Sequence, residues 1–155
     1  MRNAWCCERL SIFDRSNHPA GHSSLLNHAS VLVAEDQSFI ALDLALAIED
    51  AGGQVVGPAA SCKEAMALLA TNTVVGAIMD VNLADGVCSA VVEALVGMGA
   101  SVILQTGVGL PPDLAARFPN LIVHIKPCVA AKLVAQLEVL IAEHERPLGA
   151  GASYG

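Results

Sequence analysis

The chain has 155 residues, of which 54% are hydrophobic and 15% are charged, so a single domain of this length can bury a full core without disulfides or metal ions. Its formal net charge of −7 argues against a nucleic-acid surface, because phosphate binding requires clustered Lys and Arg. No apolar run reaches the roughly 18 residues that a membrane span needs, and no secretory signal is recognisable. We therefore expect a soluble, cytoplasmic protein with no membrane and no nucleic acid among its partners.

The chain contains five cysteines with no regular spacing. They are Cys6, Cys7, Cys62, Cys88 and Cys128. An odd and unpatterned set predicts reduced thiols of the cytosolic type, not a disulfide framework.

Strands and helices are predicted to alternate between an N-terminal arm and a C-terminal tail. Residues 1–29 show no sustained hydrophobic period and predict a poorly ordered arm. Residues 30–142 form the predicted domain, and residues 143–155 predict a flexible tail. The expected strands are 30–36, 54–59, 73–80, 101–107 and 121–127. The helices that follow them are expected within 37–53, 61–70, 87–99, 111–118 and 129–144.

This alternation predicts an α/β fold with a doubly wound, five-stranded parallel sheet. Short strands that are apolar on both faces and alternate with helices are typical of a parallel sheet covered on both sides. Five strand–helix units give the (βα)5, flavodoxin-like arrangement, in which binding sites lie at the carboxyl ends of the strands.

Ionisable and hydroxyl side chains gather at those carboxyl ends. The first strand ends in Glu35 and Asp36, the third in Asp80, the fourth in Thr106 and the fifth in Lys126. Taken singly, each has an ordinary structural explanation, such as a helix cap, a turn residue or a surface lysine. Together, three carboxylates in one cleft would repel each other unless a cation lies among them, and their hard oxygen atoms suit Mg²⁺.

The segments VAED (33–36), IMDVN (78–82), LQTG (104–107) and IKP (125–127) resemble, in this order and spacing, the receiver domain of two-component response regulators. The resemblance covers about residues 30–142 and is closest to the stand-alone chemotaxis type. It implies that Asp80 is the phosphoacceptor, which takes a phosphoryl group from a sensor histidine kinase or a phosphotransfer protein. It also implies that Lys126 pairs with the phosphoryl oxygens and that Thr106 moves to hydrogen-bond one of them.

The same resemblance implies a metal site. Glu35, Asp36 and Asp80 would hold Mg²⁺ together with the backbone carbonyl of Asn82. The protein would then catalyse only its own phosphorylation and dephosphorylation, and it would signal through protein contacts to an unknown downstream partner or through a homodimer.

The sequence departs from the family pattern near the site. Ala84 stands where a proline is usual in the turn after Asp80, and Val123 stands where the fifth strand commonly carries an aromatic residue. His124 lies beside that position and is a candidate substitute, although a histidine in an apolar strand is more often simply packed. The helix expected within 111–118 has only about two turns, so we expect it to be loosely held.

Two other functions remain as alternatives. The first is a receiver-like binding module that is not phosphorylated. The second is a metal-dependent phosphatase with an aspartyl nucleophile, which is disfavoured because Gln37 and Ser38 follow Asp36 where such enzymes carry a second aspartate two residues on. The apolar stripe of Phe39, Leu42 and Leu46 is interpreted either as buried beneath the arm or as a docking face for a kinase.

Overall fold

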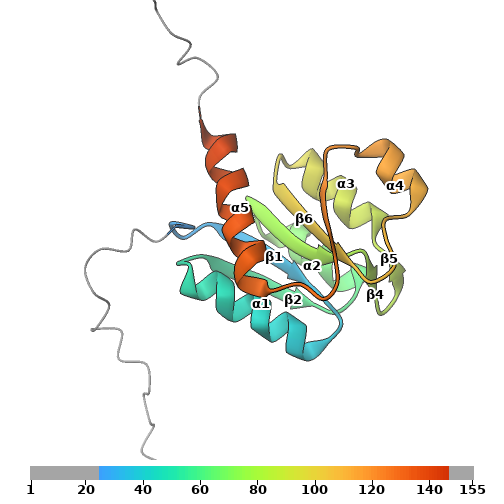
Figure 1. The fold of residues 1–155 in the computed structure, drawn as a ribbon, viewed down its shortest axis with the longest axis horizontal. Coiled ribbons are helices and arrows are strands. Elements are labelled where there is room, and N and C mark those ends of the chain that lie inside the picture. Colours follow the sequence, from blue (N-terminus) through green and yellow to red (C-terminus); the bar gives the residue numbers. More distant parts are fainter. Residues whose placement is uncertain (1–24, 147–155) are drawn as a thin grey trace, which may run out of the picture.

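The computed structural model describes residues 25–146 and contains a five-stranded parallel sheet between two layers of helices (Figure 1). The strand order is β2-β1-β3-β6-β7. These strands are β1 (Ser30–Ala34), β2 (Gln54–Ala59), β3 (Gly76–Asp80), β6 (Ser101–Thr106) and β7 (Ile122–Ile125). The helices are α1 (Ser38–Asp50), α2 (Cys62–Thr71), α3 (Ser89–Gly97), α4 (Pro112–Arg117) and α5 (Ala130–Glu145). The predicted fold class is therefore confirmed.

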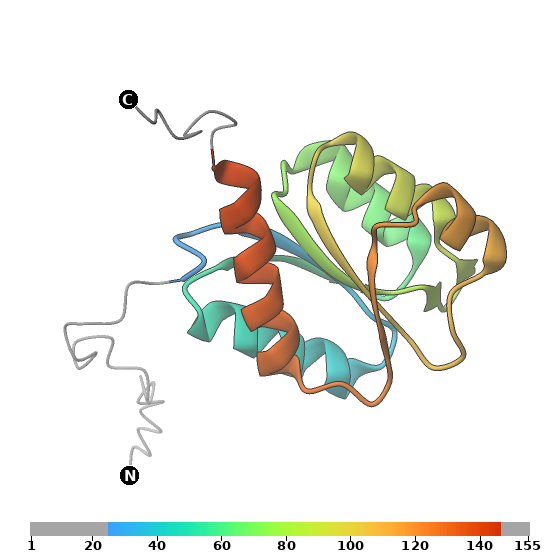
Figure 2. The same ribbon diagram turned by 45° about the horizontal axis from the view of Figure 1, so that its top comes forward.

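The central strands are apolar on both faces because each face carries its own core. Side chains of β1, β3 and β6 alternate between the two sides of the sheet. Val33, Ile78 and Ile103 pack with α1 and α5, whereas Leu32 and Met79 belong to the core beneath α2, α3 and α4. Figure 2 shows α1 and α5 together on one face of the sheet.

The order of the strands brings the residues that follow β1 and β3 close together. From β1 the chain passes to β2 on one side and then to β3 on the other side of β1. The carboxyl ends of β1 and β3 therefore lie side by side at the topological switch point, where open α/β sheets bind their ligands.

A short hairpin follows β3 and was not predicted from the sequence. β4 (Asn82–Leu83) pairs antiparallel with β5 (Gly86–Val87), so that Asn82 faces Val87. Gly86 has a φ of 121°, a backbone conformation that favours glycine over other residues. Strands of two residues are too short for a hydrophobic period to be recognised.

The packed part of the chain extends beyond the predicted 30–142 at both ends. Leu26 is buried, and its N–H donates to the carbonyl of Ala51 at 3.1 Å. At the other end α5 continues to Glu145. The rest of the predicted arm and tail lies outside the described residues. Within 25–146, no helix is both long enough and apolar enough to cross a membrane.

The prediction of reduced thiols is wrong for two cysteines, because Cys62 and Cys88 form a disulfide. Cys62 begins α2 and Cys88 immediately precedes α3, and these helices pack against each other, which brings the two Cα atoms to 5.4 Å. Their separation of 26 residues follows no local spacing rule, so the sequence alone did not reveal the pair. Cys128 is a free thiol, and Cys6 and Cys7 lie outside the described residues.

Candidate functional site

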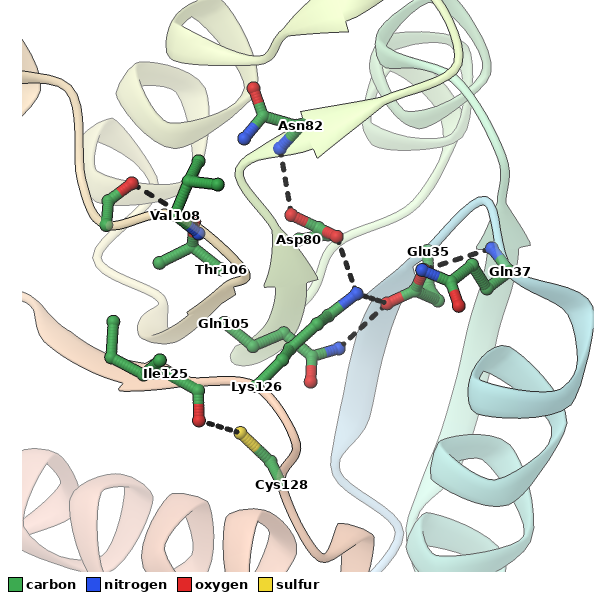
Figure 3. A network of polar contacts seen from close by, with 11 residues as sticks. Glu35, Gln37, Asp80, Asn82, Gln105, Thr106, Val108, Ile125, Lys126 and Cys128 are labelled. Carbon is green, nitrogen blue, oxygen red and sulfur yellow. Dashed lines mark hydrogen bonds and ion pairs between the residues drawn. The ribbon is translucent and has the colours of Figure 1, made fainter.

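An ammonium group joins two buried carboxylates at the carboxyl edge of the sheet (Figure 3). The Nζ atom of Lys126, just after β7, donates to Asp80 Oδ2 at 2.6 Å and to Glu35 Oε2 at 2.8 Å. Glu35 is 2% exposed and Asp80 is 6% exposed. The structure thus brings together three of the predicted site residues, which lie at or just after the ends of three different strands.

The carboxylate of Asp80, at the end of β3, has a hydrogen-bond partner on each of its two oxygens. While Oδ2 accepts from Lys126, Oδ1 accepts the backbone N–H of Asn82 at 2.9 Å. A buried carboxylate needs such partners to remain charged. The first residues of the β4–β5 hairpin therefore help to orient the Asp80 side chain.

Glu35 is held by three donors, of which only Lys126 was among the predicted site residues. Its Oε1 accepts the N–H of Gln37 at 3.0 Å, and its Oε2 accepts from Lys126 and from the side-chain amide of Gln105 at 3.1 Å. Gln105 lies on β6, is 2% exposed, and so orients Glu35 from below the site. A lone glutamine in the apolar run SVILQT was the available signal, since a buried amide requires a partner.

The two carboxylate partners of Lys126 favour its charged form. Burial by itself would lower the pKa of Lys126, but the hydrogen bonds to Asp80 and Glu35 outweigh it and raise the pKa above the usual value. The ammonium thus offsets the negative charge of the carboxylates at neutral pH.

Asp36 completes a cluster that fits a hard divalent cation. Its side chain is exposed, and oxygen atoms of Glu35, Asp36 and Asp80 all lie within 4.8 Å of one another. Carboxylates around an open, solvent-facing position suit Mg²⁺, which retains several waters in protein sites. The residues present therefore fit the predicted ion, while the role of the Asn82 carbonyl as a further ligand stays a prediction.

The cluster leads to a prediction about magnesium and stability. Mg²⁺ should raise the free energy of unfolding by about 2.7 kcal/mol at a hundredfold excess over its Kd, since it binds the native state. Asp36→Ala should lose most of this gain, because it removes one oxygen ligand without disturbing the buried pair. Thermal unfolding with and without Mg²⁺ measures the effect. Asp50→Ala, an exposed change at the far end of α1, is the control, and an equal gain in Asp36→Ala would place the ion elsewhere.

Thr106 lies at the predicted strand end, but its hydroxyl is engaged in the neighbouring loop. It donates to the carbonyl of Gly109 at 3.0 Å and accepts the N–H of Val108 at 3.3 Å. The residue is fully buried, and Figure 3 shows it apart from the Asp80–Lys126 contact. To reach a group bound at Asp80, the hydroxyl would have to exchange its bond to Gly109.

The two unusual residues of β7, Val123 and His124, each contact another part of the fold. Val123 packs against the core beneath α2, α3 and α4, and Nε2 of His124 pairs with Oε1 of Gln136 on α5. His124 is thereby held toward α5.

The helix expected within 111–118 is present as α4 and has six residues. Leu114 is its buried anchor, and Arg117 forms an ion pair with Glu93 of α3.

Comparison with solved structures identifies the fold. The chain is similar to a CheY-like receiver domain protein from Methanospirillum hungatei, with 21% identity and a TM-score of 0.65 over 76% of this chain and 96% of that one. It is similar to a Francisella receiver domain at 20% identity, with a TM-score of 0.63, over 74% and 98% of the two chains. It is also similar to the response regulator PhyR of Brucella abortus at 26% identity, with a TM-score of 0.60, over 77% of this chain and 52% of that protein.

No protein-family model matches the chain, and no curated protein matches it.

Proposed function

We propose that this chain, which has the fold of response regulator receiver domains, accepts a phosphoryl group on Asp80 and signals through protein contacts. The observation that carries the proposal is the bridge from Lys126 to Asp80 and Glu35, with Asp36 beside it. This arrangement supports the proposal because it gathers a buried carboxylate, an ammonium group and further carboxylates that could hold a metal ion at the switch point of the fold. The donor would be a phosphohistidine on a sensor histidine kinase or phosphotransfer protein.

In the proposed reaction, an oxygen of Asp80 forms a bond to phosphorus while the bond from phosphorus to the donor imidazole breaks. The imidazole leaves with the electron pair, and Asp80 becomes an acyl phosphate. Charge develops on the equatorial phosphoryl oxygens, so catalysis depends mainly on positioning and on cations. Mg²⁺ held by Glu35, Asp36 and Asp80 would supply part of the positive charge that stabilises these oxygens.

Lys126 would change partners during the transfer. Its ammonium now donates to Oδ2 of Asp80, and after transfer it would donate to a phosphoryl oxygen. Thr106 would report the change by giving up its bond to Gly109 and turning toward the phosphoryl group. These shifts would link the chemistry to the shape of the loop before α4.

An exposed apolar stripe on α1 supports docking of the donor. Phe39 is 90% exposed, and Leu42 and Leu46 are also exposed, so within the described residues this stripe is not covered. The helix starts just after Glu35 and Asp36, which places the stripe beside the site. We propose that the kinase or phosphotransfer protein docks here, in the cytoplasm, and that the output is a downstream protein or a second copy of the chain.

The test is phosphorylation by a small donor. Acetyl phosphate with Mg²⁺ should add one phosphoryl group, seen as a mass increase of the intact protein, because a receiver catalyses its own modification. The same incubation with EDTA in place of Mg²⁺ should leave the protein unmodified. No modification under either condition would favour the alternative, a receiver-like binding module that is not phosphorylated.

A further inference from the structure

Cys62 and Cys88 lie at the junction between α2 and the segment that follows Asp80. Their Cα distance of 5.4 Å is typical of disulfides in general. Cys88 is 1% exposed, whereas Cys62 is half-buried and has the exposed residues Lys63 and Asp85 beside it. Cys62 is therefore the more exposed residue of the pair, and exposed disulfides are the labile ones.

The segment 81–88 is attached to the start of α2 at three points. Both carboxylate oxygens of Asp85, in the hairpin turn, accept the N–H groups of Cys62 at 2.6 Å and Lys63 at 3.1 Å. The N–H of Ala84 donates to the carbonyl of Ala60 at 3.1 Å. The disulfide is the third attachment and the covalent one.

The same segment is attached at its other end to the proposed phosphorylation site. The N–H of Cys88 donates to the carbonyl of Val81 at 3.0 Å, and Val81 is the residue after Asp80. The next residue, Asn82, donates its N–H to Asp80 Oδ1. Cys88 is thus linked to the Asp80 carboxylate through one backbone–backbone hydrogen bond and one bond from a backbone N–H to the carboxylate.

A metal site at these cysteines is less consistent with the contacts. Ligand atoms of Cys62, Asp85 and Cys88 lie within 4.8 Å of one another, but zinc in structural sites takes four ligands. No fourth such ligand joins this group among residues 25–146. The two oxygens of Asp85 are also already engaged with the first turn of α2.

We propose that Cys62 and Cys88 form a reversible disulfide whose oxidation promotes phosphorylation at Asp80. The thiolate of Cys62 attacks a small disulfide such as oxidised glutathione, releases one thiol and forms a mixed disulfide. The thiolate of Cys88 then attacks the sulfur of Cys62 and releases the second thiol. The two cysteines lose two electrons and two protons, and the donor disulfide is reduced to two thiols.

The second half of this inference rests on the proposed function, because it states how the bond acts on Asp80. With the bond intact, the hairpin and Asn82 are held against Asp80. After reduction, the hairpin keeps only its hydrogen bonds to α2, so Asn82 spends less time in position. Oxidation should therefore speed modification by acetyl phosphate about five-fold or more, the size of an ordinary coupling between two sites.

The experiment uses the full chain with Cys6, Cys7 and Cys128 replaced by Ser, so that only the pair remains. The protein is poised with oxidised or reduced glutathione, unreacted thiols are trapped by alkylation, and the rate with acetyl phosphate and Mg²⁺ is measured in both states. Amide hydrogen exchange of residues 81–88 is followed in parallel and should be slower in the oxidised protein. Cys62→Ser and Cys88→Ala in this background should each modify at the reduced rate in both buffers.

Three results would overturn the inference: two free thiols after treatment with oxidised glutathione, equal rates in the two states, or one tightly bound zinc per chain. If neither state is modified by acetyl phosphate, the proposed function fails instead. The reversible disulfide is then tested by thiol trapping and by amide hydrogen exchange alone. Equal exchange of residues 81–88 in the oxidised and reduced protein would show that the bond does not hold this segment.

Discussion

Asp80→Asn is expected to abolish phosphorylation by acetyl phosphate completely. An amide has no anionic oxygen to attack phosphorus, whereas its carbonyl oxygen can still accept the N–H of Asn82 that now bonds to Oδ1. The substitution nearly preserves the shape of the side chain, so the fold should persist and only the chemistry should be lost. Intact-mass measurement after incubation with Mg²⁺ detects the missing phosphoryl group, and peptide mapping of the parent protein should place it on Asp80.

Asp50→Asn is the matched control for this experiment, since it makes the same chemical change at an exposed position on the last turn of α1. It should be modified as fast as the parent. Survival of the modification in Asp80→Asn, with an unfolding midpoint like that of the parent, would show that another residue is the acceptor.

Lys126→Met is expected to lower the free energy of unfolding by about 3–5 kcal/mol at neutral pH without Mg²⁺, the usual effect of removing one partner from a buried ion pair. The side chain of Lys126 is only 14% exposed, and both of its carboxylate partners are buried. Without the ammonium these carboxylates face each other without a compensating charge. Chemical denaturation measured by circular dichroism gives the change.

The pH dependence of this loss has a definite sign. The folded state raises the pKa of Lys126 above its ordinary value of 10.5. Its contribution is therefore fully present below pH 10.5 and is lost as the pH rises through the folded-state pKa.

Lys132→Met is the control, because Lys132 is exposed on α5 and the change removes the same charge. It should change the free energy of unfolding by less than about 1 kcal/mol. Mg²⁺ should restore part of the stability of Lys126→Met by supplying positive charge to Glu35 and Asp80. A variant at position 126 as stable as the parent at neutral pH would mean that the bridge contributes no net stability.

The sheet and the principal carboxylates were predictable because each signal was local. A largely apolar run that stops on a charged residue identifies both a strand and the carboxylate at its end, as in the segments that end at Glu35 and Asp80. The parallel arrangement then brings those ends together without any knowledge of side-chain contacts.

The parts that sequence reasoning missed depend on partners distant in the chain. The buried position of Gln105 is explained by its hydrogen bond to Glu35, which lies 70 residues away in the chain. Cys62 and Cys88 are paired by the packing of α2 against α3. The orientation of Thr106 depends on the loop that follows it. Local pattern identifies none of these contacts, because each is decided by tertiary structure.

The attachment point of Lys126 has a mechanical consequence. The residue follows β7, an edge strand that pairs only with β6 within the sheet. Its side chain bonds to Asp80 at the end of β3 and to Glu35 just after β1, the strands two and three places away in the sheet. The side chain thus links the edge of the sheet to its centre. If Asp80 is phosphorylated as proposed, Lys126 would turn toward a phosphoryl oxygen, and the resulting force would act on β7, an edge strand held by a single neighbour within the sheet.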